Sequence, residues 1–374
     1  MRCIVIGAGI IGATVAWRLA QRGDAVTLLD RALPGSGTSS TTFAWVNASG
    51  KDPCPRAYHE LNTAGMDAHR RLAAEFGDAP WLVPTGALEW ETSPAGLERL
   101  AARARRLADW DYNVRHLTRH EVERLEPDLL LGPDAQEVIF YPDEAHIFPS
   151  IYIACLLRAA GAHGTVLRAN TDVVEIATTG GRASGVVTRS GERLDADAVI
   201  CCCGRWTPDI LRSVGADLPL ISPAPAGSEA VGLLVRTAAV VADVRRVLLG
   251  PSGLAMRPDG GGHLLLHSDV YDRAVSADLE VSPATPTAID LLWAARPLVR
   301  HMQQTPIDSA VIGIRPIPAD GFSAVGRVAS VDGLYVIVTH SGVTLAPILA
   351  ELAASEVHGA VERLLEPFRP DRFL

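Results

Sequence analysis

The chain has 374 residues, of which 48% are hydrophobic, and a formal net charge of −9. This acidic balance argues against a surface that binds nucleic acid or an anionic membrane. The length suits one large domain or two intermingled ones. No apolar run reaches the length of a membrane span, and glycines interrupt the apolar opening, which lacks the cleavage site of a signal peptide. We therefore expect a cytoplasmic protein that begins with a buried strand.

The first half of the chain is predicted to alternate strands and helices. A strand–helix–strand unit of about the usual 30 residues is expected over residues 2–6, 10–22 and 25–30. A polar loop over residues 34–42 follows it. Periodicity predicts further helices over residues 56–76, 94–108 and 150–160, and strands over residues 85–91, 137–141 and 165–167.

The second half is predicted to be richer in strands. Turn signals separate three short strands of an antiparallel meander, over residues 173–177, 183–188 and 193–197. Residues 198–203 form an apolar run typical of a strand buried on both faces. Residues 217–312 are strand-rich, with one helix near 284–300. The chain then returns to a strand over 334–340, a turn at Ser341–Gly342 and a helix over 343–358.

The cysteines and the single lysine limit the possible chemistry. Six cysteines lie at positions 3, 54, 155 and 201–203. None has the CxxC spacing typical of zinc, so we expect no metal site. Adjacent cysteines on a strand point to opposite faces, which argues against a redox disulfide within 201–203. Lys51 is the only lysine, so any chemistry that needs an amine side chain depends on this residue.

The glycines of "IVIGAGIIG" form a GxGxxG pattern between the first strand and the first helix. Gly7 permits the tight turn, Gly9 lets the backbone approach a pyrophosphate, and Gly12 lets the helix pack on the strand. The N-terminus of the helix offers free N–H groups and a positive dipole end to phosphates. Asp30 follows eighteen residues after Gly12, where a carboxylate accepts hydrogen bonds from ribose hydroxyls. Together these features predict a dinucleotide site.

Three further motifs identify the kind of dinucleotide enzyme. They are "LLDRALPGSGTSS", the pair "NTDVVEI" and "ADAVICCCGRWTP", and the pair "GIRPIPADGFSAVG" and "GLYVIVTHSGVTLAP". In this order the motifs resemble the D-amino-acid oxidase, glycine oxidase and sarcosine oxidase superfamily of FAD enzymes. The resemblance covers nearly the whole chain, and residues 217–312 match only in their strand-rich character.

The resemblance implies a fold of α/β plus antiparallel β class. A Rossmann-like FAD-binding domain would be assembled from residues 1–77, 142–216 and 313–374. A second, mostly antiparallel-sheet substrate domain would take residues 78–141 and 217–312. The cofactor-binding positions carried over from the motifs are Gly7, Gly9, Ile10, Ile11, Gly12, Asp30, Arg31, Thr38, Ser39, Thr42, Phe43, Val173, Val174, Gly204, Trp206, Gly313, Gly342, Val343 and Thr344.

The resemblance also implies residues that act on the substrate. Arg315 stands at the motif position that holds a substrate carboxylate, a role suited to the planar fork of a guanidinium. A helix starting near Val343 would aim its dipole at the flavin and stabilise the negative charge of reduced flavin. His340 is a candidate for contact with flavin or substrate. His267 is a candidate lining residue of the pocket, with a purely structural role as the alternative.

The implied activity is FAD-dependent oxidation of the C–N bond of an amino acid or secondary amine. Hydride would pass to flavin N5 and give an imine that hydrolyses. The stretch "SAVIGIRP" lacks the cysteine that tethers flavin in sarcosine-oxidase-like members, so non-covalent FAD is expected. Lys51 does not match the position of the lysine that promotes reaction with oxygen in those relatives. The electron acceptor is therefore left open between oxygen and another molecule.

Two other functions remain open from the sequence. A flavin monooxygenase shares the N-terminal fingerprint, but the strand that ends in "CCCGRW" lacks the Asp-Gly pair usual in that class. A non-catalytic flavoprotein subunit would also carry FAD, and Arg315 counts against it. A disulfide reductase is a weaker alternative still, because no CxxxxC motif lies near the first helix.

Overall fold

The computed structural model describes residues 1–51, 53–135 and 137–374. Its six-stranded sheet has the strand order β19-β20-β13-β1-β2-β9. All neighbours pair in parallel except β19 and β20. The strands are β1 (Arg2–Ile6), β2 (Ala25–Leu29), β9 (Val166–Arg168), β13 (Ala198–Cys201), β19 (Ala324–Arg327) and β20 (Leu334–Val338). The sheet confirms the α/β part of the expected fold class, although β13 ends at Cys201 and so is shorter than predicted.

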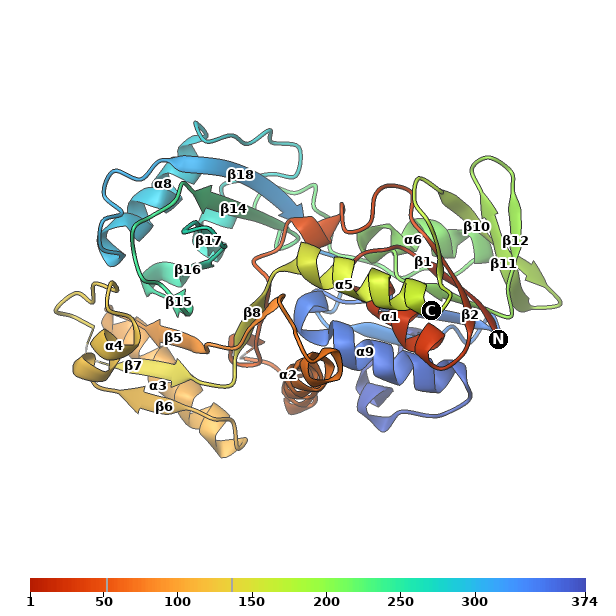
Figure 1. Ribbon diagram of the computed structural model, residues 1–374, viewed down its shortest axis with the longest axis horizontal. Coiled ribbons are helices and arrows are strands. Elements are labelled where there is room, and N and C mark those ends of the chain that lie inside the picture. Colours follow the sequence, from red (N-terminus) through yellow and green to blue (C-terminus); the bar gives the residue numbers. More distant parts are fainter. Residues whose placement is uncertain (52, 136) are drawn as a thin grey trace.

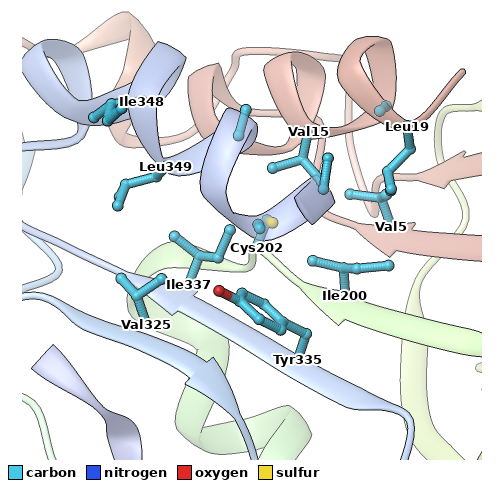
Figure 2. Close-up of a cluster of buried hydrophobic side chains, with 14 of the residues drawn as sticks. Val5, Val15, Leu19, Ile200, Cys202, Val325, Tyr335, Ile337, Ile348 and Leu349 are labelled. Carbon is cyan, nitrogen blue, oxygen red and sulfur yellow. The ribbon is translucent and has the colours of Figure 1, made fainter. Parts of the chain in front are cut away.

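One face of this sheet is covered by long helices (Figure 1). The helices of this layer are α1 (Ile10–Gln21), α2 (Arg56–Phe76), α5 (Pro149–Ala162) and α9 (Gly342–Val357). Figure 2 shows the core beneath α1 and α9, where Val15 and Leu349 lie over Ile200 and Ile337 of the sheet. All four side chains are fully or almost fully buried. Removing this much apolar surface from water is what fixes the helices to the sheet.

The opposite face is covered by a three-stranded meander and a short helix. These elements are β10 (Val173–Thr179), β11 (Arg182–Thr188), β12 (Arg193–Asp195) and α6 (Thr207–Leu211). Ile176 and Val186 of the meander pack with Ile4 and Val199 of the sheet. The sheet is therefore buried on both faces, which explains the continuous apolar runs of β1 and β13.

The second sheet has eight strands in the order β18-β14-β17-β16-β15-β5-β7-β6. They are β5 (Ala87–Trp90), β6 (Arg115–Leu117), β7 (Val138–Tyr141), β14 (Val231–Thr237), β15 (Val247–Leu249), β16 (Leu254–Pro258), β17 (Leu264–Ser268) and β18 (Ile307–Ile314). Every pair is antiparallel except β15 with β5. This sheet confirms the antiparallel part of the expected fold class.

Shorter elements connect and cover the two sheets. The helices are α3 (Pro94–Asp109), α4 (Arg119–Leu125), α7 (Asp269–Asp272) and α8 (Pro286–Ala295), and the strands of a small third sheet are β3 (Trp45–Val46), β4 (Leu82–Val83) and β8 (Ala145–Ile147). The 3-10 turns are η1 (Thr38–Ser40), η2 (Ser49–Lys51), η3 (Gly204–Trp206), η4 (Arg212–Val214), η5 (Pro251–Gly253), η6 (Arg296–Leu298), η7 (Arg363–Phe368) and η8 (Pro370–Arg372). The helix expected over 284–300 therefore ends at Ala295 and continues as a 3-10 turn.

The six-stranded sheet draws its strands from three separated parts of the chain, and the eight-stranded sheet from two others. On this basis we propose the domain boundaries expected from the sequence. The first domain would comprise residues 1–77, 142–216 and 313–374, and the second residues 78–141 and 217–312.

Candidate active site

A cavity of about 750 Å³ lies at the ends of β1 and β2, next to the start of α1. A volume of this size is typical of a cofactor pocket. Most of the residues expected to bind a cofactor line it. They are Gly7, Gly9, Ile10, Ile11, Asp30, Arg31, Thr38, Ser39, Thr42, Val173, Val174, Gly204, Trp206, Gly342 and Val343. Their contacts with a cofactor remain a prediction.

The three glycines of the fingerprint play different steric roles. A Cβ on Gly7, whose φ is +99°, would lie 2.5 Å from the carbonyl oxygen of Cys202, and one on Gly12 would lie 1.8 Å from that of Gly7. Gly12 lines neither this cavity nor the second cavity described below, and its role is to let α1 pack closely on β1. Gly9 lines the cavity, and the next backbone N–H, that of Ile10, donates to Ser39 Oγ at 3.0 Å.

Asp30 holds the glycine turn as well as lining the cavity. Its Oδ2 accepts the N–H of Ala8 at 2.7 Å, and its Oδ1 accepts the N–H of Ala32 at 2.8 Å. Each carboxylate oxygen keeps a further lone pair. The carboxylate can therefore order the turn and still accept a ribose hydroxyl from the cavity side.

The first turn of α9 forms another wall of the cavity. A Cβ on Gly342 would meet protein atoms only at 3.8 Å or more, so this glycine is not required by the packing of the chain itself. Gly342 is the first residue of the 16-residue helix α9, so the free N–H groups and the positive end of the helix dipole lie here. His69 Nε2 donates to the Val343 carbonyl at 2.8 Å. Burial lowers the pKa of His69 to about 4, which keeps the ring neutral at this bond.

Two arginines stack on Trp206 at the edge of the cavity. The guanidinium carbon of Arg31 lies 4.1 Å from the ring centroid, and that of Arg205 lies 4.2 Å from it. Arg205 was not predicted as a site residue, although it lies inside the motif "CCCGRW". Other lining residues missed by sequence reasoning include Ser36, Thr171, Asp172, Arg189, Cys202, Cys203, Asp209 and Thr339. Most of these also lie inside the quoted motifs, and only Arg189 and Asp209 among them lie outside.

A second cavity, of about 720 Å³, adjoins the first. The two share lining residues, namely Thr38, Thr41, Thr42, Pro316, His340 and Val343. The remaining predicted site residues face this second cavity and not the first. They are Phe43, His267, Gly313, Arg315 and Thr344. The structure thus brings together residues that are up to about 300 positions apart in the sequence.

Arg315 directly follows β18 and is held by two acceptors. Its Nη2 donates to Asp272 Oδ2 at 2.5 Å, and its Nη1 donates to the carbonyl of Glu229 at 3.1 Å. The side chain is 24% exposed, and it lines the second cavity. Because a guanidinium has five N–H donors, Arg315 can bind an anion while both of these bonds persist.

The two candidate histidines differ in their surroundings. His340 lines both cavities, and burial lowers its pKa to about 3, with Lys51 and Arg315 adding repulsion. Its imidazole is therefore neutral near pH 7. His267 Nε2 lies 3.3 Å from Asp269 Oδ1. The hydrogen bond from His267 lowers the pKa of Asp269 to about 2, so this carboxylate is charged at the cavity wall.

His267, Asp269 and Asp272 also place three potential metal-ligand atoms within 4.8 Å of one another. However, the guanidinium of Arg315 already provides the cation at Asp272. We therefore assign His267 and Asp269 to the lining of the second cavity, and Asp272 to the support of Arg315, and not to a metal site.

Sequence reasoning missed the basic lining of the second cavity. Lys51 reaches it from η2, and three arginines of α3 reach it from the far side. These arginines are Arg99, Arg103 and Arg106. Their spacing of four and three residues places them on one helix face, whereas the sequence predicted only the helix itself.

The glycine-rich turn at the N-terminus of α1, here called the cofactor cradle, adjoins a cavity that Arg315 lines. On a scaffold of two sheets, this arrangement defines a dinucleotide-dependent enzyme. More specifically, the chain belongs to the family described as FAD dependent oxidoreductase, which matches residues 2–356. The protein is thus an FAD-dependent oxidoreductase. The cradle fits this cofactor, since Gly9 and Gly342 leave room where a side chain would intrude on the cavity.

Relatives of known name match this chain over part or most of its length. It is 26% identical over 364 residues to a glycine oxidase of Geobacillus kaustophilus (strain HTA426), spanning 94% of this chain and 92% of the relative. It is 30% identical over 223 residues to a 4-methylaminobutanoate oxidase (formaldehyde-forming) of Paenarthrobacter nicotinovorans, spanning 59% of this chain and 26% of the relative.

Solved structures share the same fold. Glycine oxidase from Geobacillus kaustophilus has a TM-score of 0.84 at 24% identity, with 100% of this chain and 99% of that chain covered. L-proline dehydrogenase from P. horikoshii has a TM-score of 0.85 at 16% identity, with 100% and 97% covered. Among the helices of the described residues, none is both long and apolar enough to cross a membrane.

Proposed function

We propose that the protein oxidises the C–N bond of an amino acid or secondary amine. The observation that carries this proposal is the position of Arg315 in a cavity that adjoins the cofactor cradle. Arg315 would bind the substrate carboxylate through charge-assisted hydrogen bonds. The named relatives, a glycine oxidase and a 4-methylaminobutanoate oxidase, support this reaction class.

The residues of the cavity suit a neutral amine. His340 is neutral at pH 7 because of its lowered pKa, so it would not repel or protonate the amine. The FAD isoalloxazine supplies the acceptor for a hydride, at N5. Loss of the hydride from the carbon and of a proton from nitrogen gives an imine, which water converts to a carbonyl compound and an amine. Arg315 would fix the orientation of the reacting carbon, and this positioning is a large part of the rate gain.

FAD is proposed to be held without a covalent bond, since the stretch before Arg315 contains no cysteine. Acid precipitation of the purified protein tests this point. Yellow colour in the supernatant supports non-covalent binding, and colour that stays with the pellet contradicts it.

The decisive experiment is anaerobic. The flavin absorbance of the holoenzyme is followed while D- and L-amino acids and N-methyl amino acids are added in turn. Bleaching by one of these classes supports amine oxidation, and admission of air then tests oxygen as the acceptor. If no amine bleaches the flavin, the proposed reaction is wrong and a monooxygenase or a non-catalytic subunit takes its place. Bleaching by NADPH would favour the monooxygenase.

A further inference from the structure

The second cavity is electropositive although the protein as a whole is acidic. Of the described residues, five basic side chains line it, against three acidic ones, while the whole chain carries a net charge of −9. The basic residues are Lys51, Arg99, Arg103, Arg106 and Arg315, and the acidic ones are Glu89, Glu91 and Asp269. A cavity with this excess of positive charge attracts anions.

Two of these cations are already neutralised by carboxylates of the protein. Arg315 pairs with Asp272, and Arg103 pairs with Glu89, which also accepts the hydroxyl of Tyr141. Lys51 differs from them. Within the described residues, none accepts a hydrogen bond or forms an ion pair with its Nζ. Lys51 therefore brings a positive charge to the cavity wall that no carboxylate in the described part of the chain contacts directly.

The turn that carries Lys51 is held by hydrogen bonds to a buried carboxylate. The turn η2 is anchored by the fully buried Glu144, which accepts the N–H of Ser49 at 3.1 Å and the indole N–H of Trp45 at 2.9 Å. A third donor, the hydroxyl of Tyr112, lies 2.7 Å away. A buried carboxylate with three hydrogen bonds is costly to rearrange. Lys51 is thus presented to the cavity by a fixed support, as expected of a binding residue.

The charge of Lys51 is coupled electrostatically to Arg315 and His340, which line the same cavity. Burial lowers the pKa of Lys51 to about 8, and repulsion from Arg315 contributes to this shift. Both cations in turn lower the pKa of His340. Two like charges that share a partly desolvated cavity are stabilised when each receives its own anion.

We propose that Lys51 binds a second anionic group of the substrate, so that the enzyme acts on amines with two carboxylates. One carboxylate is bound by Arg315 beside the cofactor cradle, and the other by Lys51. This assignment rests on the proposed function, because it names the substrate class of the same reaction.

The test uses pairs of ligands that differ only in charge. Binding of inert glutarate and of its monoamide to the holoenzyme is measured by calorimetry. Anaerobic bleaching by D- and L-glutamate is compared with bleaching by the corresponding glutamines. We expect the dianion of each pair to bind about tenfold or more tightly, which is the effect of one charge-assisted hydrogen bond.

Variants of Lys51 locate the source of this preference. Lys51→Met, which keeps most of the side-chain length, should remove the preference by weakening the dianions alone, and Lys51→Arg should restore part of it. Arg105→Ala is the matched control, because Arg105 is exposed on α3 and does not line the cavity. This variant should bind both members of each ligand pair as the unmodified enzyme does.

Three results would overturn the assignment. They are equal binding of dianion and monoamide by the unmodified enzyme, equal weakening of both by Lys51→Met, and an effect of Lys51→Met confined to reoxidation of reduced flavin by oxygen. Failure of the wider proposal looks different. In that case no amine bleaches the flavin, whereas calorimetry with glutarate still reports on Lys51.

Discussion

Asp272 and Arg315 form a close ion pair at the wall of the second cavity, with 2.5 Å between Asp272 Oδ2 and Arg315 Nη2. Asp272 Oδ1 accepts the backbone N–H of Leu233 at 2.7 Å. Burial raises the pKa of Asp272, whereas His267 and Arg315 act in the opposite direction. The charge of Arg315 thus favours the ionised carboxylate, and the carboxylate in turn fixes the direction of the guanidinium fork. Asp272 is therefore a positioning residue for the proposed substrate anchor.

Replacing Asp272 by Asn should weaken substrate binding without loss of FAD. The amide keeps the shape of the side chain but removes the charge that orients Arg315. A charge-assisted hydrogen bond contributes about 1.5–3 kcal/mol, so we expect KM to rise roughly tenfold or more with a smaller change in kcat. Steady-state kinetics and the flavin-to-protein ratio provide the measurement. Equal losses of kcat and FAD content would indicate a general structural role instead.

Replacing Arg315 by Ala should have the larger effect on substrate capture. It removes the anchor and leaves the buried Asp272 without its cation, a combination that typically costs about 2–5 kcal/mol. We expect a corresponding fall in kcat/KM, with FAD still bound. The matched control is Arg236→Ala, since Arg236 lies in the neighbouring strand β14, pairs with Asp259 and Asp308, and lines neither cavity. Unchanged kinetics of Arg315→Ala would refute the anchor role.

Two glycine substitutions should separate cofactor binding from folding. Gly342→Ala places a methyl group where the nearest protein atom is 3.8 Å away, so the apoprotein should keep its melting temperature. FAD affinity should fall about tenfold or more, the effect of overpacking a close contact. Gly12→Ala places the methyl group 1.8 Å from the carbonyl oxygen of Gly7 and should destabilise the apoprotein itself. Thermal unfolding and FAD titration of both variants decide the matter, and undiminished FAD affinity in Gly342→Ala would contradict the predicted contact.

The buried His69 should contribute to loss of stability in acid. Its pKa is lowered from 6.5 to about 4 in the folded protein, so the unfolded chain binds the proton more readily. The contribution of His69 is therefore complete above about pH 6.5 and is lost as the pH falls towards 4. At 1.36 kcal/mol per pKa unit, the loss is roughly 3 kcal/mol.

His69→Gln removes the titrating group and keeps a donor for the Val343 carbonyl. Urea unfolding between pH 7 and pH 4.5 should show a shallower decline for this variant than for the unmodified protein. His163→Gln is the control, because His163 is exposed. Parallel declines for all three proteins would show that His69 is not among the groups responsible.

Local patterns were enough to predict the strand–helix–strand unit, the C-terminal strand–turn–helix and one long helix. The helix over 56–76 begins and ends where the sequence indicated, and the strand–helix–strand unit and the C-terminal strand–turn–helix agree to within two residues. These segments have strong periodicity and clear turn residues, so their structure follows from short-range preferences. The short strands β3 and β8 gave no periodic signal and were missed, whereas the equally short β9 and β12 were predicted.

The sequence by itself was enough to predict a dinucleotide cofactor, because the GxGxxG turn, the helix after it and Asp30 lie within about 30 residues and act through local backbone geometry. Only the tertiary structure decided what surrounds the substrate. Asp272 meets Arg315 across 43 positions, and Lys51 shares a cavity with residues of α3 and with His340. Such contacts depend on how the two sheets and their connecting turns pack. No local sequence pattern shows which charged side chains line the same cavity.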